Sequence, residues 1–170
     1  MKKVTIREAE PSDAEQLIAH VQRLADETDI NVPLAPGEFN LTVDEEREIL
    51  AGYAGSRNSL FLVAELESQI VGALTCKGGT RQATRHSVTL GVSIRKGERG
   101  KRIGTALVAR AIEWAKSTGV VTRIELKVLA GNRIATHLYE KFGFQIEGRR
   151  QRAIYHNGEY ADDLIMALLL

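Results

Sequence analysis

Short runs of apolar residues, some of them alternating with polar residues, recur along the chain and predict β-strands. They lie at residues 3–9, 60–66, 70–76, 87–94 and 123–129. Two more strand-like runs follow towards the end of the chain, where Asn157 and Gly158 separate them. Because Asn-Gly between two such runs favours a tight turn, we expect a β-hairpin there. The polar residues 67–69 predict a second antiparallel turn.

Apolar residues at helical spacing predict four helices between the strands. Ser12 and Glu15 have the spacing of a capping box and precede the first helical pattern. Thr42 and Glu45 repeat this spacing before the second pattern. Both helices are therefore expected to begin close to these residues.

The third helix is expected to be long, because apolar residues form a wide stripe over residues 103–115 before Gly119 ends the pattern. The fourth helix covers residues 132–142. The element order contains two strand-helix-strand units beside antiparallel hairpins, which predicts an α/β fold with one mixed sheet and helices on both faces. No linker interrupts this order, so we expect residues 1–170 to form a single domain.

Composition narrows the range of partners. The chain has 170 residues, of which 44% are hydrophobic, and this is sufficient for one buried core. Its 23 basic and 22 acidic side chains leave a formal net charge of +1, and only 5% of the residues are aromatic. Nucleic acid is not expected as a partner, because it requires excess positive charge or stacking surfaces. A membrane partner is not expected either, since no run approaches the roughly 20 apolar residues that cross a bilayer.

The single cysteine, Cys76, excludes an internal disulfide and a multi-cysteine metal site. It lies within an apolar run with no histidine nearby in sequence, so we expect a buried strand residue and not a nucleophile. The amino-terminal residues lack the pattern of a signal peptide. A reducing, cytoplasmic location and the absence of a bound metal are the resulting expectations.

The segment VSIRKGERGKRIGTA, residues 92–106, is the main candidate for binding chemistry. A predicted strand leads into a loop with two glycines and five basic residues, and the loop leads directly into the third helix. Glycine lets a ligand approach the backbone, and the first N–H groups of a helix are free to bind an anion. Both a phosphate site and a solvated basic surface fit this charge pattern. The Walker and Rossmann spacings do not fit it, since Gly100 and Lys101 are followed by Arg102 and a third glycine is missing.

Part of this loop, RGKRIG, resembles the pyrophosphate-binding motif of the GNAT superfamily of N-acetyltransferases. That motif has Gln or Arg, two residues, Gly, one residue, and then Gly or Ala, and it matches here at Arg99 and Gly104. Arg102 replaces the middle glycine. We interpret this replacement as tolerable, because the backbone angles at the start of a helix are open to any residue, and the arginine can add a contact with phosphate.

A second segment, residues 132–148, resembles another GNAT signature, which has Asn, an Ala three residues later, Leu-Tyr, Gly-Phe and a later Gly. The matching residues are Asn132, Ala135, Leu138, Tyr139, Gly143, Phe144 and Gly148. An amphipathic helix ending at a glycine explains some of these residues by packing alone. It does not explain the basic glycine loop one strand and one helix earlier.

The resemblance implies the GNAT fold, whose mostly antiparallel sheet opens between the strands at residues 87–94 and 123–129 to admit the pantetheine of acetyl-CoA. Acetyl-CoA would be the co-substrate and an amine the acceptor, with Val92 and Ile94 offering main-chain groups and an N–H near Ile94 polarising the thioester. The residues that the resemblance assigns to acetyl-CoA are Val92, Ile94, Arg99, Gly100, Lys101, Arg102, Ile103, Gly104, Thr105 and Asn132.

The resemblance also implies direct attack of a neutral amine on the thioester. The strand before the loop has no carboxylate where many GNAT members place a glutamate, so Glu125 and a chain of water molecules both remain as routes for the amine proton. Tyr139 resembles the general acid that protonates the CoA thiolate, although a packing role also fits its position.

The acceptor remains open among small-molecule amines, amino acids, and peptide or protein N-termini. The acidic residues Asp26, Glu27, Asp29 and Glu38 would suit a cationic amine, or they are simply solvated. A non-catalytic acyl-CoA-binding regulatory domain of the same fold is the alternative function. The family and the apolar final run, residues 164–170, also suggest a homodimer, although that run equally suits an internal strand.

Overall fold

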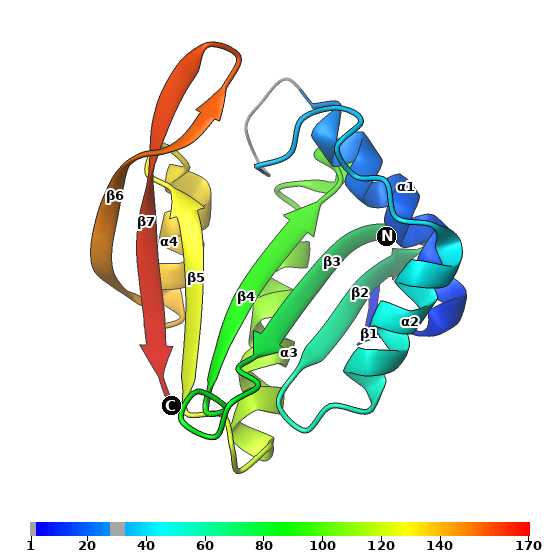
Figure 1. Cartoon of the computed structure of the whole chain (residues 1–170), viewed down its shortest axis with the longest axis horizontal. Helices are drawn as coiled ribbons and strands as arrows, with labels where there is room; N and C mark the ends of the chain where they lie inside the picture. Colours follow the sequence, from blue (N-terminus) through cyan, green and yellow to red (C-terminus); the bar gives the residue numbers. More distant parts are fainter. Residues whose placement is uncertain (1–2, 28–32) are drawn as a thin grey trace.

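The computed structural model describes residues 3–27 and 33–170, and its helices and strands follow the predicted order (Figure 1). The strands are β1 (Thr5–Glu8), β2 (Leu60–Leu66), β3 (Gln69–Gly78), β4 (Ser87–Ile94), β5 (Arg123–Leu129), β6 (Gln145–His156) and β7 (Glu159–Leu169). The helices are α1 (Ala14–Ala25), α2 (Val43–Ala54), α3 (Ile103–Ser117) and α4 (Arg133–Lys141), with short 3-10 turns at Pro11–Asp13 and Lys96–Glu98.

All seven strands form one sheet in the order β1-β2-β3-β4-β5-β7-β6. Only β4 and β5 are parallel, and every other neighbouring pair is antiparallel. The predicted mixed sheet is therefore confirmed. The apolar final strand β7 lies between β5 and β6, so it is internal. This placement removes one of the two reasons for expecting a homodimer, which stays a prediction.

Helices cover both faces of the sheet, as predicted, because neighbouring strand residues point to opposite sides. Leu62 joins the core beneath α3 and α4, whereas Val63 joins a second core beneath α1 and α2. Leu107 from α3 and Leu17 from α1 are each almost fully buried in these two cores. Figure 1 shows α1 and α2 beside the half of the sheet formed by β1 to β3. Both layers therefore pack against β2 and β3.

The two predicted capping boxes have different outcomes. The box before α2 is confirmed, since Thr42 Oγ1 accepts a hydrogen bond from Glu45 N at 3.2 Å and Glu45 Oε2 accepts one from Thr42 N at 2.8 Å. The box at Ser12 and Glu15 is wrong. Glu10 and Asp13 form the box instead, and α1 begins only at Ala14.

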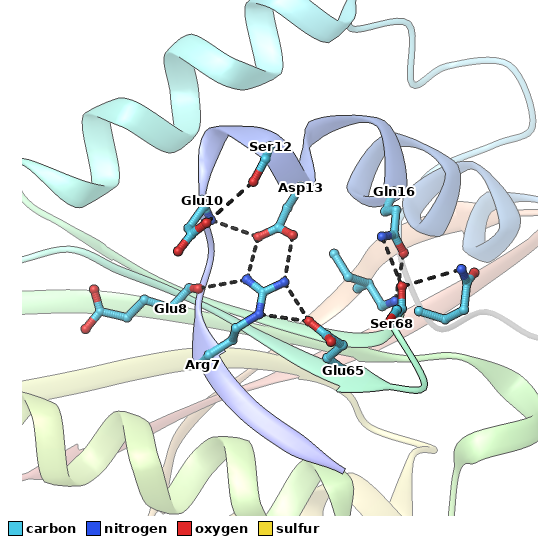
Figure 2. Close-up of polar contacts among 10 residues, drawn as sticks. Arg7, Glu8, Glu10, Ser12, Asp13, Gln16, Glu65 and Ser68 are labelled. Carbon is cyan, nitrogen blue, oxygen red and sulfur yellow. Dashed lines mark hydrogen bonds and ion pairs between the residues drawn. The ribbon is translucent and has the colours of Figure 1, made fainter. Parts of the chain in front are cut away.

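The side chain of Asp13 has this role because Arg7 on β1 fixes it in place (Figure 2). Arg7 Nη1 and Nη2 donate to the two carboxylate oxygens of Asp13 at 2.7 and 2.8 Å, and Arg7 Nε donates to Glu65 Oε2 on β2 at 2.9 Å. Asp13 Oδ2 also accepts a hydrogen bond from Glu10 N at 2.8 Å. Burial favours the neutral acid, but the contacts with Arg7 and Glu10 outweigh it and lower the pKa of Asp13.

We expect Asp13→Asn to lower the free energy of unfolding by about 1–3 kcal/mol at neutral pH, because a buried guanidinium contact loses its anion. A carboxyl group whose pKa is lower in the folded state stabilises the fold above its unfolded pKa, and it loses this effect as the pH falls through its folded pKa. The difference between variant and parent should therefore shrink below about pH 4. Urea unfolding between pH 2 and pH 8 measures it.

Glu65→Gln is the control, because its side chain is 30% exposed and its ion pair should contribute less than about 1 kcal/mol. Equal losses in the two variants, or a loss for Asp13→Asn that does not change with pH, would contradict the assignment.

Candidate active site

The parallel strands β4 and β5 pair over only part of their length. Their four residue pairs run from Ser87 with Arg123 to Leu90 with Leu126. Beyond these pairs, β4 continues to Ile94 against β3, and β5 continues to Leu129 against β7. We call residues 91–94 and 127–129 the open segment, since they have no residue pairing with each other. Figure 1 shows the two strands diverging there.

The main-chain groups of Val92 and Ile94 point into this open segment. Arg95 N donates to Val71 O at 2.8 Å, and this bond continues the β3–β4 register. In an antiparallel pair, hydrogen-bonded residues alternate with residues whose N–H and C=O point away from the partner strand. The odd-numbered residues of β4 therefore bond to β3. The even-numbered residues turn their N–H and C=O groups towards β5, which no longer pairs with them.

The loop after β4 ends in a backbone conformation that the sequence did not lead us to expect. Gly100 has a φ of 78°, and Arg102, which precedes the first turn of α3, has a φ of 64°. This is the left-handed region, which costs a residue with a side chain about 1–2 kcal/mol. Our interpretation that any residue suits this position is therefore wrong. Glycine, which the motif has at this position, adopts a positive φ without this cost.

The three basic side chains predicted to bind phosphate differ in their surroundings. Arg99 Nε donates to Ile94 O at 2.9 Å, and its Nη2 contacts Glu27 Oε2 beyond the end of α1 at 2.6 Å. Lys101 Nζ donates to Glu98 Oε2 at 2.9 Å. The Arg102 guanidinium forms no hydrogen bond or ion pair within residues 3–27 and 33–170. Arg99 thus links the loop after β4 to Ile94 and to Glu27 just beyond α1. The charge of Arg102 has no bonded partner among the described residues.

The second motif lies on α4. Asn132 caps this helix, since its Oδ1 accepts a hydrogen bond from Ala135 N at 3.1 Å. Tyr139 is 5% exposed, and its ring packs against Phe144 with a centroid distance of 5.7 Å. Burial raises the pKa of Tyr139 to about 12, so its phenol remains protonated at neutral pH. The ring belongs to the core, and the hydroxyl retains a proton to donate.

Cavities border the sheet at both ends. One of about 600 Å³ borders the carboxyl end of β5, and its lining includes Leu129, Asn132, Arg149 and Asp162. Another, of about 790 Å³, includes Tyr53, Asn58 and Lys77 and lies at the far end of β3 from the open segment. In the described part of the chain, no helix is long and apolar enough to cross a membrane. The same residues contain no cluster of metal-ligating side chains.

Comparison with known proteins decides the family. The sequence signature of the acetyltransferase (GNAT) family matches residues 18–144, which is more than half of the chain. The chain belongs to the GNAT family. It is 34% identical over 106 residues to an L-amino acid N-acetyltransferase of Escherichia coli (strain K12), covering 62% of this chain and 65% of that relative. The chain therefore matches slightly less than two thirds of this relative's length.

Solved structures share the whole GNAT fold. A GNAT-family acetyltransferase from Streptococcus pneumoniae is 36% identical and superimposes with a TM-score of 0.94 over 99% of both chains. A ribosomal-protein-alanine N-acetyltransferase from Brucella melitensis is 26% identical, with a TM-score of 0.84 over 98% of this chain and 99% of that one. These similarities confirm the fold class predicted from the sequence.

Glu125, the candidate base of this GNAT protein, lies at the edge of the open segment. It pairs with Thr89 of β4 one position before the last β4–β5 pair. Its carboxylate accepts a hydrogen bond from Arg123 Nη2 at 2.9 Å, and Arg123 also contacts Glu147 on β6. The Glu125 side chain thus lies at the edge of the open segment, and the guanidinium of Arg123 already binds its carboxylate.

Sequence reasoning missed His20, which α1 places against the open segment. Its side chain is 2% exposed, and Nε2 lies 2.9 Å from Ser93 Oγ. Burial lowers the pKa of His20 to about 4, and the positive charges of Arg95, Arg23 and Arg99 add to the effect. His20 is therefore neutral at neutral pH. A polar residue within the apolar stripe of the first helix was the available signal.

Two of the acidic residues suggested for a cationic acceptor are engaged within the chain. Glu27 pairs with Arg99, and Glu38 Oε2 accepts a hydrogen bond from Ala35 N at 2.8 Å. Asp26 ends α1, and Asp29 lies outside the described residues.

Cys76 is fully buried on β3, as predicted. Burial raises the pKa of its thiol to about 12, so the thiolate is scarcely present at neutral pH. It is unsuited to act as a nucleophile.

Because Arg102 holds a left-handed backbone, we expect Arg102→Gly to be more stable than Arg102→Ala by about 1 kcal/mol. Both variants lack the guanidinium, so the comparison isolates the backbone. Urea unfolding of the ligand-free proteins measures the difference. Equal stability would mean that position 102 is not held at positive φ in solution.

Proposed function

We propose that this protein is an acetyl-CoA-dependent N-acetyltransferase that transfers the acetyl group directly to an amine. The observation that carries the proposal is the open segment, where main-chain groups of Val92 and Ile94 lack a strand partner directly before the basic glycine loop. Such groups need a hydrogen-bonding partner. The amides of an extended pantetheine chain supply one in the manner of an added strand.

In this proposal, each part of the coenzyme meets a different part of the chain. The N–H of Ile94 and both main-chain groups of Val92 bind pantetheine and the thioester carbonyl. The carbonyl of Ile94 is already occupied by Arg99. The pyrophosphate binds the first N–H groups of α3, where the helix dipole favours negative charge. The residues around that pyrophosphate are Arg99, Gly100, Lys101, Arg102, Ile103, Gly104 and Thr105.

Tyr139 supplies the proton for the departing CoA thiolate, because its phenol is protonated at neutral pH and can donate a hydrogen bond to sulfur. Its raised pKa of about 12 makes it a weaker acid than an exposed tyrosine. Asn132 orders the start of α4 beside the end of β5. The acceptor must lose a proton as well, and Glu125 and a chain of water molecules both remain as routes. We place the reaction in the cytoplasm, in keeping with the single cysteine of the chain.

The acceptor we propose is a primary amine. By their names, the relatives compared above act on amino acids and on a ribosomal protein's alanine. Turnover measured over small amines, amino acids and an N-terminal peptide tests the activity. Binding of acetyl-CoA without turnover of any amine would favour the non-catalytic alternative.

Acetyl-CoA should stabilise the protein through the glycine loop. A ligand at about 100 times its Kd adds about 2.7 kcal/mol, which corresponds to a rise in Tm of about 5–10 °C for a protein of this size. Arg102→Glu should reduce the rise by at least half, since it places an anion beside the pyrophosphate. Thermal unfolding with and without acetyl-CoA measures it.

The matched control is Arg110→Glu, an exposed position further along α3. It makes the same charge change away from the loop and should leave the rise intact. If Arg102→Glu and the control respond alike, the loop does not bind the coenzyme.

Tyr139→Phe should lower kcat by about 100-fold and leave the Kd of acetyl-CoA nearly unchanged, because it removes only the proton donor from a buried ring. Single-turnover kinetics separate this step from product release. A parent-like rate at saturating amine would reduce Tyr139 to a packing residue.

A further inference from the structure

Lys127 stands at the point where the open segment begins. The last residue pair between β4 and β5 joins Leu90 to Leu126. Lys127 is the next residue on β5, and Gly91 is the next residue on β4. Leu126 and Val128 are buried in the core beneath α3 and α4. Because strand residues alternate, Lys127 points to the opposite face, where it is exposed. Gly91 has no side chain, so at this level of the opening β5 contributes a side chain and β4 does not.

The ammonium of Lys127 has no bonded partner. It forms no hydrogen bond or ion pair within residues 3–27 and 33–170, whereas its cationic neighbour on the same face of β5 is paired. Arg123 contacts Glu125 and Glu147. Asp163 on the neighbouring strand β7 is 3% exposed and already receives hydrogen bonds from Arg150 Nε and Nη2, the former at 2.8 Å.

The other groups around the opening do not bond to this ammonium. Arg150 is the main cause of the lowered pKa of Asp163, and Lys127 contributes less to it. On the β4 side, His20 is neutral at neutral pH and is held by Ser93. Among the residues that the structure describes, Lys127 is therefore the cation on this face of β5 without a bonded partner, and such an ammonium attracts an anionic group.

The phosphates of the coenzyme do not account for this charge. They would bind at the start of α3, and α3 lies on the other face of the sheet from the Lys127 side chain. Gly91 and Ile94 are three residues apart along β4, which separates the beginning of the open segment from the loop by about 10 Å. An anion at Lys127 must therefore come from the acceptor.

We propose that Lys127 binds the carboxylate of the acceptor, and that the acceptor is a free amino acid. This inference rests on the proposed function, which would put the thioester in the open segment, beside the main chain of Val92 and Ile94. In an amino acid the carboxylate lies one carbon from the amine, so an ammonium across the opening from the thioester can orient both groups. A peptide N-terminus lacks that carboxylate, and so does a polyamine.

The test compares three acceptors with the same side chain: the L-amino acid that a panel of the common amino acids shows to be best, its amide, and the amine that lacks the carboxylate. Lys127→Met should reduce kcat/KM for the amino acid by about 10–100-fold, as expected for one charge-assisted hydrogen bond. The values for the amide and the amine should change less than about threefold. Lys127→Arg, which keeps the cation, should recover part of the loss.

Lys116→Met is the matched control, because it removes an exposed lysine near the end of α3. Equal losses on all three acceptors would overturn the carboxylate role of Lys127, as would a parent enzyme that acetylates the amide as well as the amino acid.

A measurement of binding separates this inference from the proposed function. Calorimetric titration of the same amino acid into protein saturated with CoA should show binding that Lys127→Met weakens by at least tenfold. If that binding exists but no amine is acetylated, the enzymatic proposal fails and the carboxylate site stands. If the parent does not bind the amino acid, or the variant binds it equally well, the carboxylate site is refuted.

Discussion

The organisation of this protein depends on where two parallel strands stop satisfying each other's hydrogen bonds. A backbone N–H or C=O inside a sheet needs a partner, and β4 and β5 provide one only as far as Leu90 and Leu126. The outer neighbours β3 and β7 hold both strands in place beyond that point. The contact of Arg99 with Ile94 O further secures the end of β4. The neighbouring strands thus hold the unpaired groups of β4 and β5 in place. This favours the binding of a ligand between the two strands over closure of the strands onto each other.

The loop that follows β4 also contains a residue in an energetically unfavourable backbone conformation. Arg102 occupies a left-handed backbone where glycine would be easier, and it leaves its guanidinium unengaged at the start of α3. Helix α1 contributes on the other face, through His20 at Ser93 and through Glu27 at Arg99. Residues from both faces of the sheet therefore support the basic glycine loop, since α3 follows it and Glu27 pairs with Arg99. The ammonium of Lys127 lies on the face opposite α3.

The sequence was sufficient to predict the order of helices and strands, because the signals for that order lie within short stretches of the chain. These signals are the spacing of hydrophobic residues, the Asn157-Gly158 turn and the capping box at Thr42. It was insufficient where distant residues decide the outcome. Asp13 starts the first helix because Arg7 holds it, and Arg99 meets Glu27 across 72 positions of the chain. The resemblance implied that Val92 and Ile94 offer main-chain groups, but the register with β3 that turns those groups towards the opening involves distant strands. The positive φ of Arg102 depends on the turn before α3 and did not follow from the motif. Its spacing located the loop without showing which of its cations is engaged.

Cys76 affects how catalysis can be observed. Each acetyl transfer releases a CoA molecule with a free thiol, and the only cysteine of the folded chain is fully buried with a thiol pKa of about 12. A colour-forming disulfide reagent would therefore report the product without reacting with the native protein. Unfolding would expose Cys76 and give one additional equivalent of colour. A substitution that impairs chemistry could thus be distinguished, in the same cuvette, from one that merely denatures the protein.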